Sequence, residues 1–415
     1  TFAADRSLTI DAKGIDNIAN TPVITTSGTG SIALTATQSI LLRAGAVLNT
    51  VNGGVTLSGN AAGTSTDLFS GVDLAGAIVT STGSGAIGLT GRSGTGGPLY
   101  GVHLRTSAQV TSTSASGGGG ITINGTSNSS ADDSYGVFVA DTNTLIDSKS
   151  GAIQITAVGG TGDSSHGLFL NASARITTTG GAAPITLIAT GGDNDNSAGL
   201  VINGAASTIS TVTGPISITA TANAARVGGA GVSTRGGTIT STDGGTITIT
   251  ADGNGTTEAF ELDDQIIGSA AAGLLAGTGT ITLTGDQLTI TQTSGTSAIS
   301  GAGALIIQPQ TAGTTIEIGD ETGAGILNLS DSELGFLTDG FSSITIGKAD
   351  AGNVEINTAI FNDPVTILTG GIIRDELGSP DLTLPAGVTA TLSGTVAPGQ
   401  LVAGPTEHPG ILNVT

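Results

Sequence analysis

The side chains best suited to ligand contact recur at one kind of position. Tyr100, Tyr135 and His166 each stand directly before a glycine that opens a short alternating apolar segment. Three residues after each of them, on the outward side of that segment, come His103, Phe138 and Phe169. If successive segments stack, these side chains form one aromatic patch, which suits a sugar ring or a protein partner. The alternative is that the preceding loops fold back and bury the rings as a small satellite core.

Carboxylates collect in the loops that precede the same glycines. They are Asp67, Asp132, Asp133, Asp163, Asp193 and Asp195. Stacked carboxylates repel one another unless water or a cation such as Ca²⁺ separates them. The segment GGDNDNSAG, which holds Asp193 and Asp195, begins like a calcium loop but lacks the glycine at its sixth position and the distal glutamate. A calcium site at these two residues and a solvated acidic edge both remain open.

A catalytic site is harder to assemble from this sequence. Polysaccharide hydrolases use paired carboxylates, and lyases a Lys or Arg base beside calcium. The candidate bases Arg92, Arg105, Lys149 and Arg175 fall at different positions of the pattern, and the histidines 103, 166 and 408 lack metal-ligand spacing. We therefore expect no enzyme, no catalytic residue and no cofactor other than calcium. A polysaccharide-active enzyme is the alternative.

A repeat of about 32 residues must position these side chains. One marker is the first apolar residue of segments such as AIQITA, at Val55, Ile87, Ile121, Ile153, Ile185, Ile216 and Ile247, in steps of 32, 34, 32, 32, 31 and 31. The glycines at 71, 101, 136, 167, 199 and 231 keep nearly the same period. Short alternating segments at a fixed period, which cannot bury their apolar faces alone, predict a solenoid of stacked coils. We predict an all-β parallel β-helix with three strands per coil and about 30–35 residues per coil.

A third segment closes each coil. We place its inward apolar residue at Ile78, Val110, Ile146, Ile176, Ile209 and Ile239, each followed two places on by Ser or Thr. These hydroxyls, from Thr80 to Ser241, are expected to hydrogen-bond to one another along a narrow corner of the coil.

Composition agrees with a narrow, regular core. The 415 residues include 69 Gly, 2% aromatic residues and no Cys, Met or Trp, with a mean hydropathy of +0.28. A formal charge of −21 repels phosphate backbones, so nucleic acid is not an expected partner. No apolar run is long enough to span a membrane. The absence of Cys suits a secreted bacterial protein, and the start at Thr1 without Met or a signal-like segment suggests a mature piece of something longer.

Four regions follow from the pattern. Residues 1–50 form irregular N-terminal coils, 51–265 regular coils with long loops, 266–370 coils shortened to roughly twenty residues, and 371–415 Pro-containing C-terminal coils that lead into a following region. Within the third region, Ser330 and Glu333 have capping-box spacing and predict one helical turn.

Residues 327–371 resemble a known family. LNLSDSELGFLTDGFSSITIGKADAGNVEINTAIFNDPVTILTGG is similar to the L-x-L-S-x-x-E-L … L-x-I-G … I-x-V pattern of large bacterial secreted proteins related to filamentous haemagglutinin. LSGTVAPGQ and HPGILNVT, separated by residues 401–407, resemble a segment of autotransporter-like passenger regions. The resemblance implies a right-handed parallel β-helix on a bacterial surface and no catalytic residues.

The sequence thus predicts a rigid extracellular rod that acts in adhesion or assembly. Its expected contacts are Tyr100, His103, Tyr135, Phe138, His166 and Phe169, and its expected partners are a surface glycan, a protein or further copies of itself.

Overall fold

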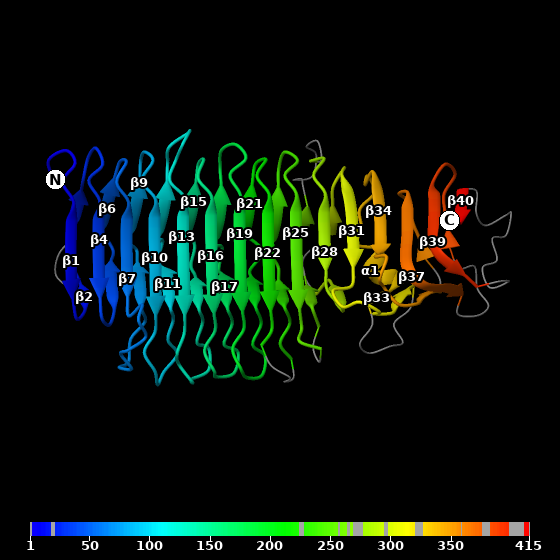
Figure 1. The fold of residues 1–415 in the computed structure, drawn as a ribbon, viewed down its shortest axis with the longest axis horizontal. Coiled ribbons are helices and arrows are strands. Elements are labelled where there is room, and N and C mark those ends of the chain that lie inside the picture. The colour runs from blue at the N-terminus through cyan, green and yellow to red at the C-terminus, as the bar shows by residue number, and fades with distance from the viewer. Residues whose placement is uncertain are drawn as a thin grey trace.

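The computed structural model describes residues 2–17, 21–223, 228–255, 258–263, 266–268, 277–293, 298–319, 327–357, 359–375, 382–397 and 411–414. The chain forms a long rod with its two ends at opposite ends of the long axis (Figure 1). Successive turns of the chain lie side by side along this axis, and loops project below the blue-to-green coils as a fringe (Figure 1).

Three parallel sheets run along the rod, and in most of it each coil contributes one strand to each sheet. Sheet A contains β1 (Leu8–Ala12), β4 (Ile32–Ala36), β7 (Val55–Gly59), β10 (Ile87–Arg92), β13 (Ile121–Thr126), β16 (Ile153–Val158), β19 (Ile185–Thr190), β22 (Ile216–Thr221), β25 (Ile247–Asp252), β28 (Ile281–Thr284), β31 (Ala304–Gln308), β32 (Ile316–Ile318), β33 (Leu327–Leu329), β34 (Ser343–Gly347), β35 (Val354–Ile356), β37 (Val365–Asp375), β39 (Thr389–Val396) and β40 (Ile411–Val414).

Sheets B and C complete the coils. Sheet B contains β2 (Ile15–Asp16), β5 (Ile40–Arg43), β8 (Val72–Ala75), β11 (Val102–Arg105), β14 (Val137–Val139), β17 (Leu168–Asn171), β20 (Leu200–Asn203), β23 (Val232–Arg235), β26 (Phe260–Asp263) and β29 (Leu288–Thr291). Sheet C contains β3 (Val23–Thr25), β6 (Val47–Thr50), β9 (Ile78–Ser81), β12 (Gln109–Ser112), β15 (Leu145–Ser148), β18 (Arg175–Thr178), β21 (Thr208–Thr211), β24 (Thr238–Ser241), β27 (Ile266–Gly268) and β30 (Ala298–Ser300). A small fourth sheet pairs β36 (Ala359–Ile360) with β38 (Leu382–Thr383).

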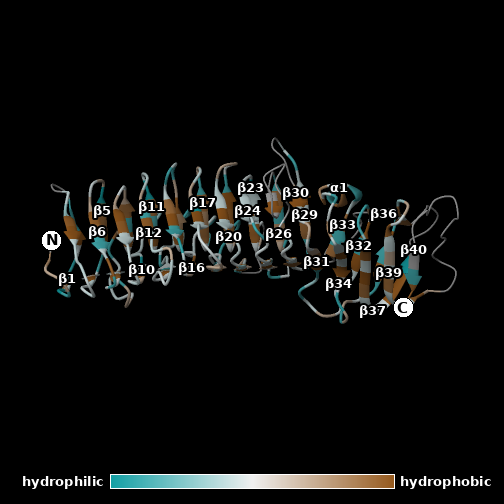
Figure 2. Cartoon of the chain, turned by 90° about the horizontal axis from the view of Figure 1, so that it is seen from above, coloured by the Kyte–Doolittle hydropathy of each residue, from teal (hydrophilic) through white to brown (hydrophobic). Residues whose placement is uncertain are grey.

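The predicted parallel β-helix is confirmed. Each strand of the middle coils pairs in parallel with the strand one coil away, so that Ile153 lies between Ile121 and Ile185. The inward residues form continuous ladders: Ile153, Ile155, Leu168 and Leu170 are all fully buried. In Figure 2 the strands are largely brown and the connecting loops white or teal. Removing these aliphatic ladders from water, at roughly 25 cal/mol per Å², is the main stabilising term.

Sheet C differs from the prediction in two respects. In β9 the inward residue is Val79 rather than Ile78, and the buried hydroxyl is that of Ser81 rather than Thr80, because Val79 is the residue that pairs with Val110. The buried hydroxyls also do not bond to one another. Thr178 and Thr211 donate to carbonyls of their own following turns, at 3.0 and 2.6 Å, because the chain bends there and leaves those carbonyls facing the coil interior.

The glycine before each sheet B strand is required by close packing. A Cβ atom on Gly167 would lie 2.6 Å from the backbone nitrogen of Thr190 and 2.7 Å from the carbonyl oxygen of Gly199. The loop leaving sheet A therefore returns against the next coil at a distance that only glycine permits. The same position recurs in each middle coil, which explains the glycine period of the sequence.

Coil length changes at both ends of the rod. Leu8 pairs with Ile32 and Ile32 with Val55, steps of 24 and 23 residues. Toward the C-terminus Ile281 pairs with Leu305, Leu305 with Ile344, and Ile344 with Val365, steps of 24, 39 and 21 residues. The long step holds β32, β33 and the helical turn α1 (Asp331–Leu334). The position 370 proposed as a boundary falls inside β37.

The helical turn α1 has the predicted capping box. The Ser330 hydroxyl accepts from the Glu333 amide, and the Glu333 carboxylate accepts from the Ser330 amide at 2.9 Å. The second carboxylate oxygen of Glu333 accepts from the Ile290 amide of β29 at 2.9 Å, so this buried residue ties α1 to sheet B. No helix among the described residues is long and apolar enough to cross a membrane.

Candidate functional site

Two rows of side chains run along the outer face of sheet B, with one member of each row per coil. The first row holds the residue directly before each sheet B glycine or its equivalent, and reads Tyr100, Tyr135, His166, Ala198, Ala230, Glu258. The second row holds the central outward residue of each strand, and its members pair in order: Asp73, His103, Phe138, Phe169, Val201, Ser233, Glu261, Thr289.

All six predicted contact residues lie together in these rows. We call them the ring stack: Tyr100, His103, Tyr135, Phe138, His166 and Phe169. In the first row Tyr135 stacks between Tyr100 and His166, with ring centroids 5.5 and 5.3 Å away. In the second row Phe138 stacks between His103 and Phe169, at 4.9 and 5.2 Å. Rings of the two rows meet edge to face, as in Tyr135 and Phe169, whose centroids are 5.0 Å apart.

The six side chains of the ring stack are more buried than those of an exposed patch would be. Tyr135 is buried, with 6% of its surface exposed, and the other five residues are half-buried. The loops from sheet A lie beside the first row, and the Tyr135 hydroxyl donates to Asp133 Oδ1 of its loop at 3.1 Å. The satellite-core alternative therefore describes the middle of the stack, whereas its C-terminal end adjoins open space. The role of the six residues as ligand contacts stays a prediction.

Burial within the stack lowers the pKa of both of its histidines. It lowers the pKa of His166 to about 4, and the charge of Arg235 lowers it further. Burial also lowers the pKa of His103 to about 4, against the opposing effect of Asp73. Both imidazoles are therefore neutral at pH 7. The Ala198 amide donates to Nδ1 of His166 at 3.1 Å, which assigns the proton of this neutral ring to Nε2.

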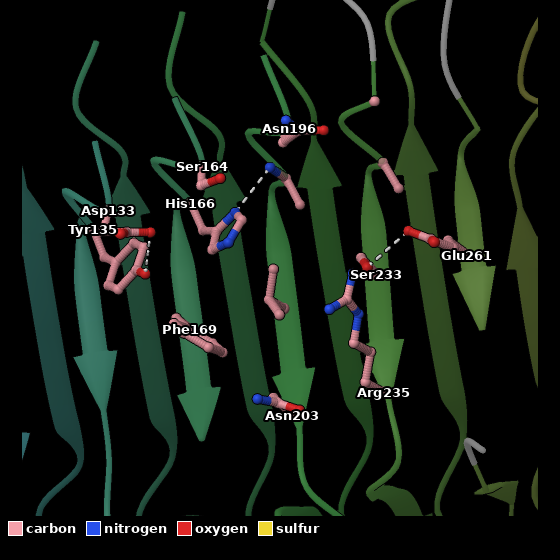
Figure 3. Close-up of a pocket in the computed structure, with 14 residues that line it drawn as sticks. Asp133, Tyr135, Ser164, His166, Phe169, Asn196, Asn203, Ser233, Arg235 and Glu261 are labelled. Carbon is pink, nitrogen blue, oxygen red and sulfur yellow. Dashed lines mark hydrogen bonds between the residues drawn. The ribbon is translucent and has the colours of Figure 1, made fainter. Parts of the chain in front are cut away.

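A groove begins where the rings end. After His166 and Phe169, the next two coils carry only small side chains in the two rows: Ala198 with Val201, and Ala230 with Ser233. The resulting space, the sheet B groove, has a volume of about 550 Å³. Figure 3 shows His166 and Phe169 at one end, Ser233 and Glu261 toward the other, and Asn203 and Arg235 along one edge.

The far end of the groove is acidic and polar. Ser233 donates its hydroxyl hydrogen to Glu261 Oε2 at 3.0 Å. Burial raises the pKa of Glu258, the first-row residue of the same coil; a hydrogen bond from Thr289 opposes the shift and the charge of Glu261 adds to it. The carboxylate of Glu261 therefore lines the end opposite the aromatic rings, and Glu258 belongs to the same coil.

The edge of the groove supplies hydrogen-bonding groups. The side-chain amide of Asn203 donates to Asn171 Oδ1 at 3.1 Å, which links two coils and holds both amides along the edge. The Arg235 guanidinium is exposed, and no carboxylate among the described residues lies within ion-pair distance of it. Arg235 is thus a cation available to a ligand.

Beyond the other end of the ring stack, the cations are already paired. Both donors of the Arg105 guanidinium fork bond to Asp73 at 3.0 Å, and the His103 ring lies beside the same carboxylate. Arg43 pairs with Asp16 in the same manner two coils further toward the N-terminus. The charges of Arg105 and Arg43 are therefore already balanced by carboxylates of the chain.

The predicted calcium residues are not joined by further ligands. Asp193 accepts a hydrogen bond from the Asn223 amide, and the backbone carbonyl of Asp195 accepts from the Ser164 amide at 2.9 Å. The part of the chain that the structure describes contains no group of three or more His, Cys, Asp or Glu that could hold a metal ion. Asp132, Asp133 and Asp193 are exposed, as in the solvated-edge alternative. Calcium binding at Asp193 and Asp195 stays a prediction.

The sequence pattern did not identify four residues that line the groove, namely Asn203, Ser233, Arg235 and Glu261, nor Glu258 in the same coil as Glu261. Residues such as Ala198 and Ser233 are common in this composition, so their types alone do not mark a site. Following the glycine marker two coils further would have shown the change from rings to small residues to carboxylates. His408 lies outside the described residues.

No protein-family model, curated protein or solved structure matches this chain.

Proposed function

We propose that this chain is a non-catalytic rod of a bacterial cell-surface or secreted protein, and that its sheet B groove binds a glycan. The observation that carries the proposal is the groove itself, which interrupts an otherwise regular surface with an aromatic end, an apolar floor and a polar far end. Ligand sites combine mostly apolar walls with a few placed polar groups in this way.

The regularity of the remaining coils supports the structural part of the proposal. Parallel strands about 4.8 Å apart, with ladders of buried aliphatic residues, make a stiff and extended support. Such a support holds a binding site at a distance from whatever anchors the chain. The resemblance of residues 327–371 to haemagglutinin-like repeat proteins supports a bacterial surface or extracellular location.

A large side chain introduced into the groove tests the proposal. Ser233→Tyr places a ring above the floor, whereas Ser217→Tyr places the same ring on the exposed outer face of sheet A in the same coil. We expect Ser233→Tyr to abolish binding to glycan arrays and to host-cell surfaces, and Ser217→Tyr to leave it unchanged. Equal binding by the wild type and both variants would refute the assignment of the groove.

A polysaccharide-active enzyme is the second candidate, and one observation favours it. Burial raises the pKa of Glu258 and the charge of Glu261 adds to the rise, and glycosidases use a carboxyl group with a raised pKa together with a second carboxyl group. A reducing-end assay over neutral and acidic polysaccharides tests this candidate. Release of new reducing ends by the wild type but not by Glu258→Gln would establish the enzyme, and no release would leave the binding proposal standing.

A further inference from the structure

The sheet B groove is a gap in a stack of rings. Within the ring stack, successive centroids along each row lie 4.9 to 5.5 Å apart, which is close to the spacing of the coils. His166 and Phe169 are the last rings, so the faces that a following ring would cover are free of ring neighbours. From β17 to β26 there are three coil steps, about 14 Å at 4.8 Å each. At the two coil levels between the rings and Glu261, the second row carries Val201 and Ser233 in place of rings.

We infer that the sheet B groove binds a neutral saccharide, with one pyranose ring at the level of Ala198 and Val201 against the faces of His166 and Phe169. This inference rests on the proposed glycan-binding function and names its ligand class and its contacts.

The near half of the groove suits the C–H face of a sugar. The face of an aromatic ring carries partial negative charge and attracts the weakly positive hydrogens of an apolar surface. The floor beneath this position is Ala198, with 2% of its surface exposed, and Val201, with 7%. A ring placed here continues the stack and removes the exposed surface of Phe169 from water, while Val201, already buried, lies beneath it.

The far half suits sugar hydroxyls. Glu261 accepts from Ser233 through one oxygen, which leaves acceptor capacity on its carboxylate for ligand hydroxyl groups. Asn203 and Arg235 stand along the edge, where the guanidinium supplies donors to hydroxyl or ring oxygens. An apolar ligand would leave these groups desolvated and unpaired, at a cost for each.

The charge of the groove favours a neutral sugar over an acidic one. Its lining includes the carboxylates of Asp133 and Glu261 against one cation, Arg235. The chain as a whole carries a formal charge of −21. A uronate or sulfated sugar would meet both the local and the overall repulsion, and Arg235 alone does not reverse them.

Isothermal titration of the whole chain with saccharides of matched size tests the inference. The panel contains neutral hexose and N-acetylhexosamine oligosaccharides and their uronate counterparts. We expect at least one neutral oligosaccharide to bind, and its uronate counterpart to bind at least about 10-fold more weakly at low salt.

Three variants locate the bound ring. Phe169→Ala removes the stacking face, and we expect a loss of affinity on the order of 10-fold. Val201→Phe instead fills the ring position and extends the stack, so that binding is lost while the thermal midpoint is kept or raised. Thr186→Ala, on the outer face of sheet A, is the matched control and should leave affinity unchanged.

The outcomes separate the two proposals. A saccharide that binds wild type and Val201→Phe equally would place binding elsewhere on the rod and overturn the inference, while glycan binding by the chain would survive. Tighter binding of the uronate counterpart would overturn the choice of a neutral ligand. If no saccharide of either charge binds, and Ser233→Tyr does not change attachment to cells, the proposed function itself fails.

Discussion

The outer faces of sheets A and B are built by the same repeat and differ in how their rows change along the rod. On sheet A the central outward residues are short and mostly polar from coil to coil: Thr56, Gly88, Thr122, Gln154, Thr186, Ser217 and Thr248. On sheet B the corresponding row passes from Asp73 through three rings to Val201, Ser233 and Glu261. The first face is uniform, and the second contains a groove.

The comparison shows how a solenoid can acquire a site without altering its fold. The strands pair in parallel in both sheets, so strand geometry alone does not create the groove, although the loop residues Ser164, Asn196 and Gly228 contribute to its lining. It arises because large side chains stop at one coil and small ones follow. The buried aliphatic residues that recur from coil to coil stabilise the rod, and the outward side chains that change from coil to coil form the groove that we propose as a binding site.

The largest expected effect is on the shared interior. Ile155 of sheet A is fully buried between Ile123 and Leu187, so Ile155→Asp would place an unpaired charge in the ladder. We expect a loss of more than about 4 kcal/mol in the free energy of unfolding, the range seen when an unpaired charge is buried. Chemical denaturation followed by circular dichroism measures it.

The control is the adjacent outward residue. Gln154→Asp changes charge on the exposed face of the same strand and should alter the free energy of unfolding by less than about 0.5 kcal/mol. Similar losses in the two variants would contradict the division of each strand into an inward and an outward face.

The next effect is confined to sheet B and depends on pH. The folded-state pKa values of His103 and His166 are about 4, below the value of about 6.5 expected in the unfolded chain. Between these values the unfolded chain binds more protons, so stability is fully present above pH 6.5 and is lost as the pH falls through 6.5 toward 4. Each shift corresponds to at most about 3 kcal/mol.

Replacing one imidazole isolates this contribution. His103→Phe keeps a ring between Asp73 and Phe138 and removes the proton, so unfolding measured from pH 7.5 to 4 should lose part of its acid slope. An unchanged slope would mean that folding does not lower the pKa of His103. The nearby charges of Asp73, Arg105 and Asp141 remain in both proteins.

The smallest effect concerns the ion pair beside the ring stack. Arg105 and Asp73 form two hydrogen bonds of 3.0 Å, but the Arg105 side chain is 36% exposed. A partly solvated pair of this kind contributes about 1 kcal/mol or less. Arg105→Gln should therefore lower the free energy of unfolding by no more than that and leave saccharide affinity unchanged, whereas a larger loss would show that the pair supports the stack.

The fold was largely predictable because, in a solenoid, residues that lie one repeat apart in the sequence contact each other in neighbouring coils. Steps near 32 residues between Ile121, Ile153 and Ile185 became the observed sheet A pairing. The assignment failed at Ile78, where two adjacent β-branched residues gave no means of choosing the inward one, and pairing with the next coil selected Val79.

The candidate site was predictable in part for the same reason. Rare residues at a constant offset from a glycine identified every member of the ring stack. The groove was not predicted, since it is defined by small side chains, and a site formed by Ala198, Val201 and Ala230 has no distinctive residue type. The burial of Tyr135 depended on how its own loop packs, which the repeat does not specify.

An NMR titration shows whether a saccharide occupies the sheet B groove. In protein labelled at the methyl groups of Val and Ile, the Val201 methyls report on the groove floor and the Ile188 methyls, 41% exposed, report on the outer face of sheet A. On addition of a neutral oligosaccharide, we expect saturable shifts of the Val201 signals and none of the Ile188 signals. Saturable binding that leaves the Val201 methyls unmoved would contradict it.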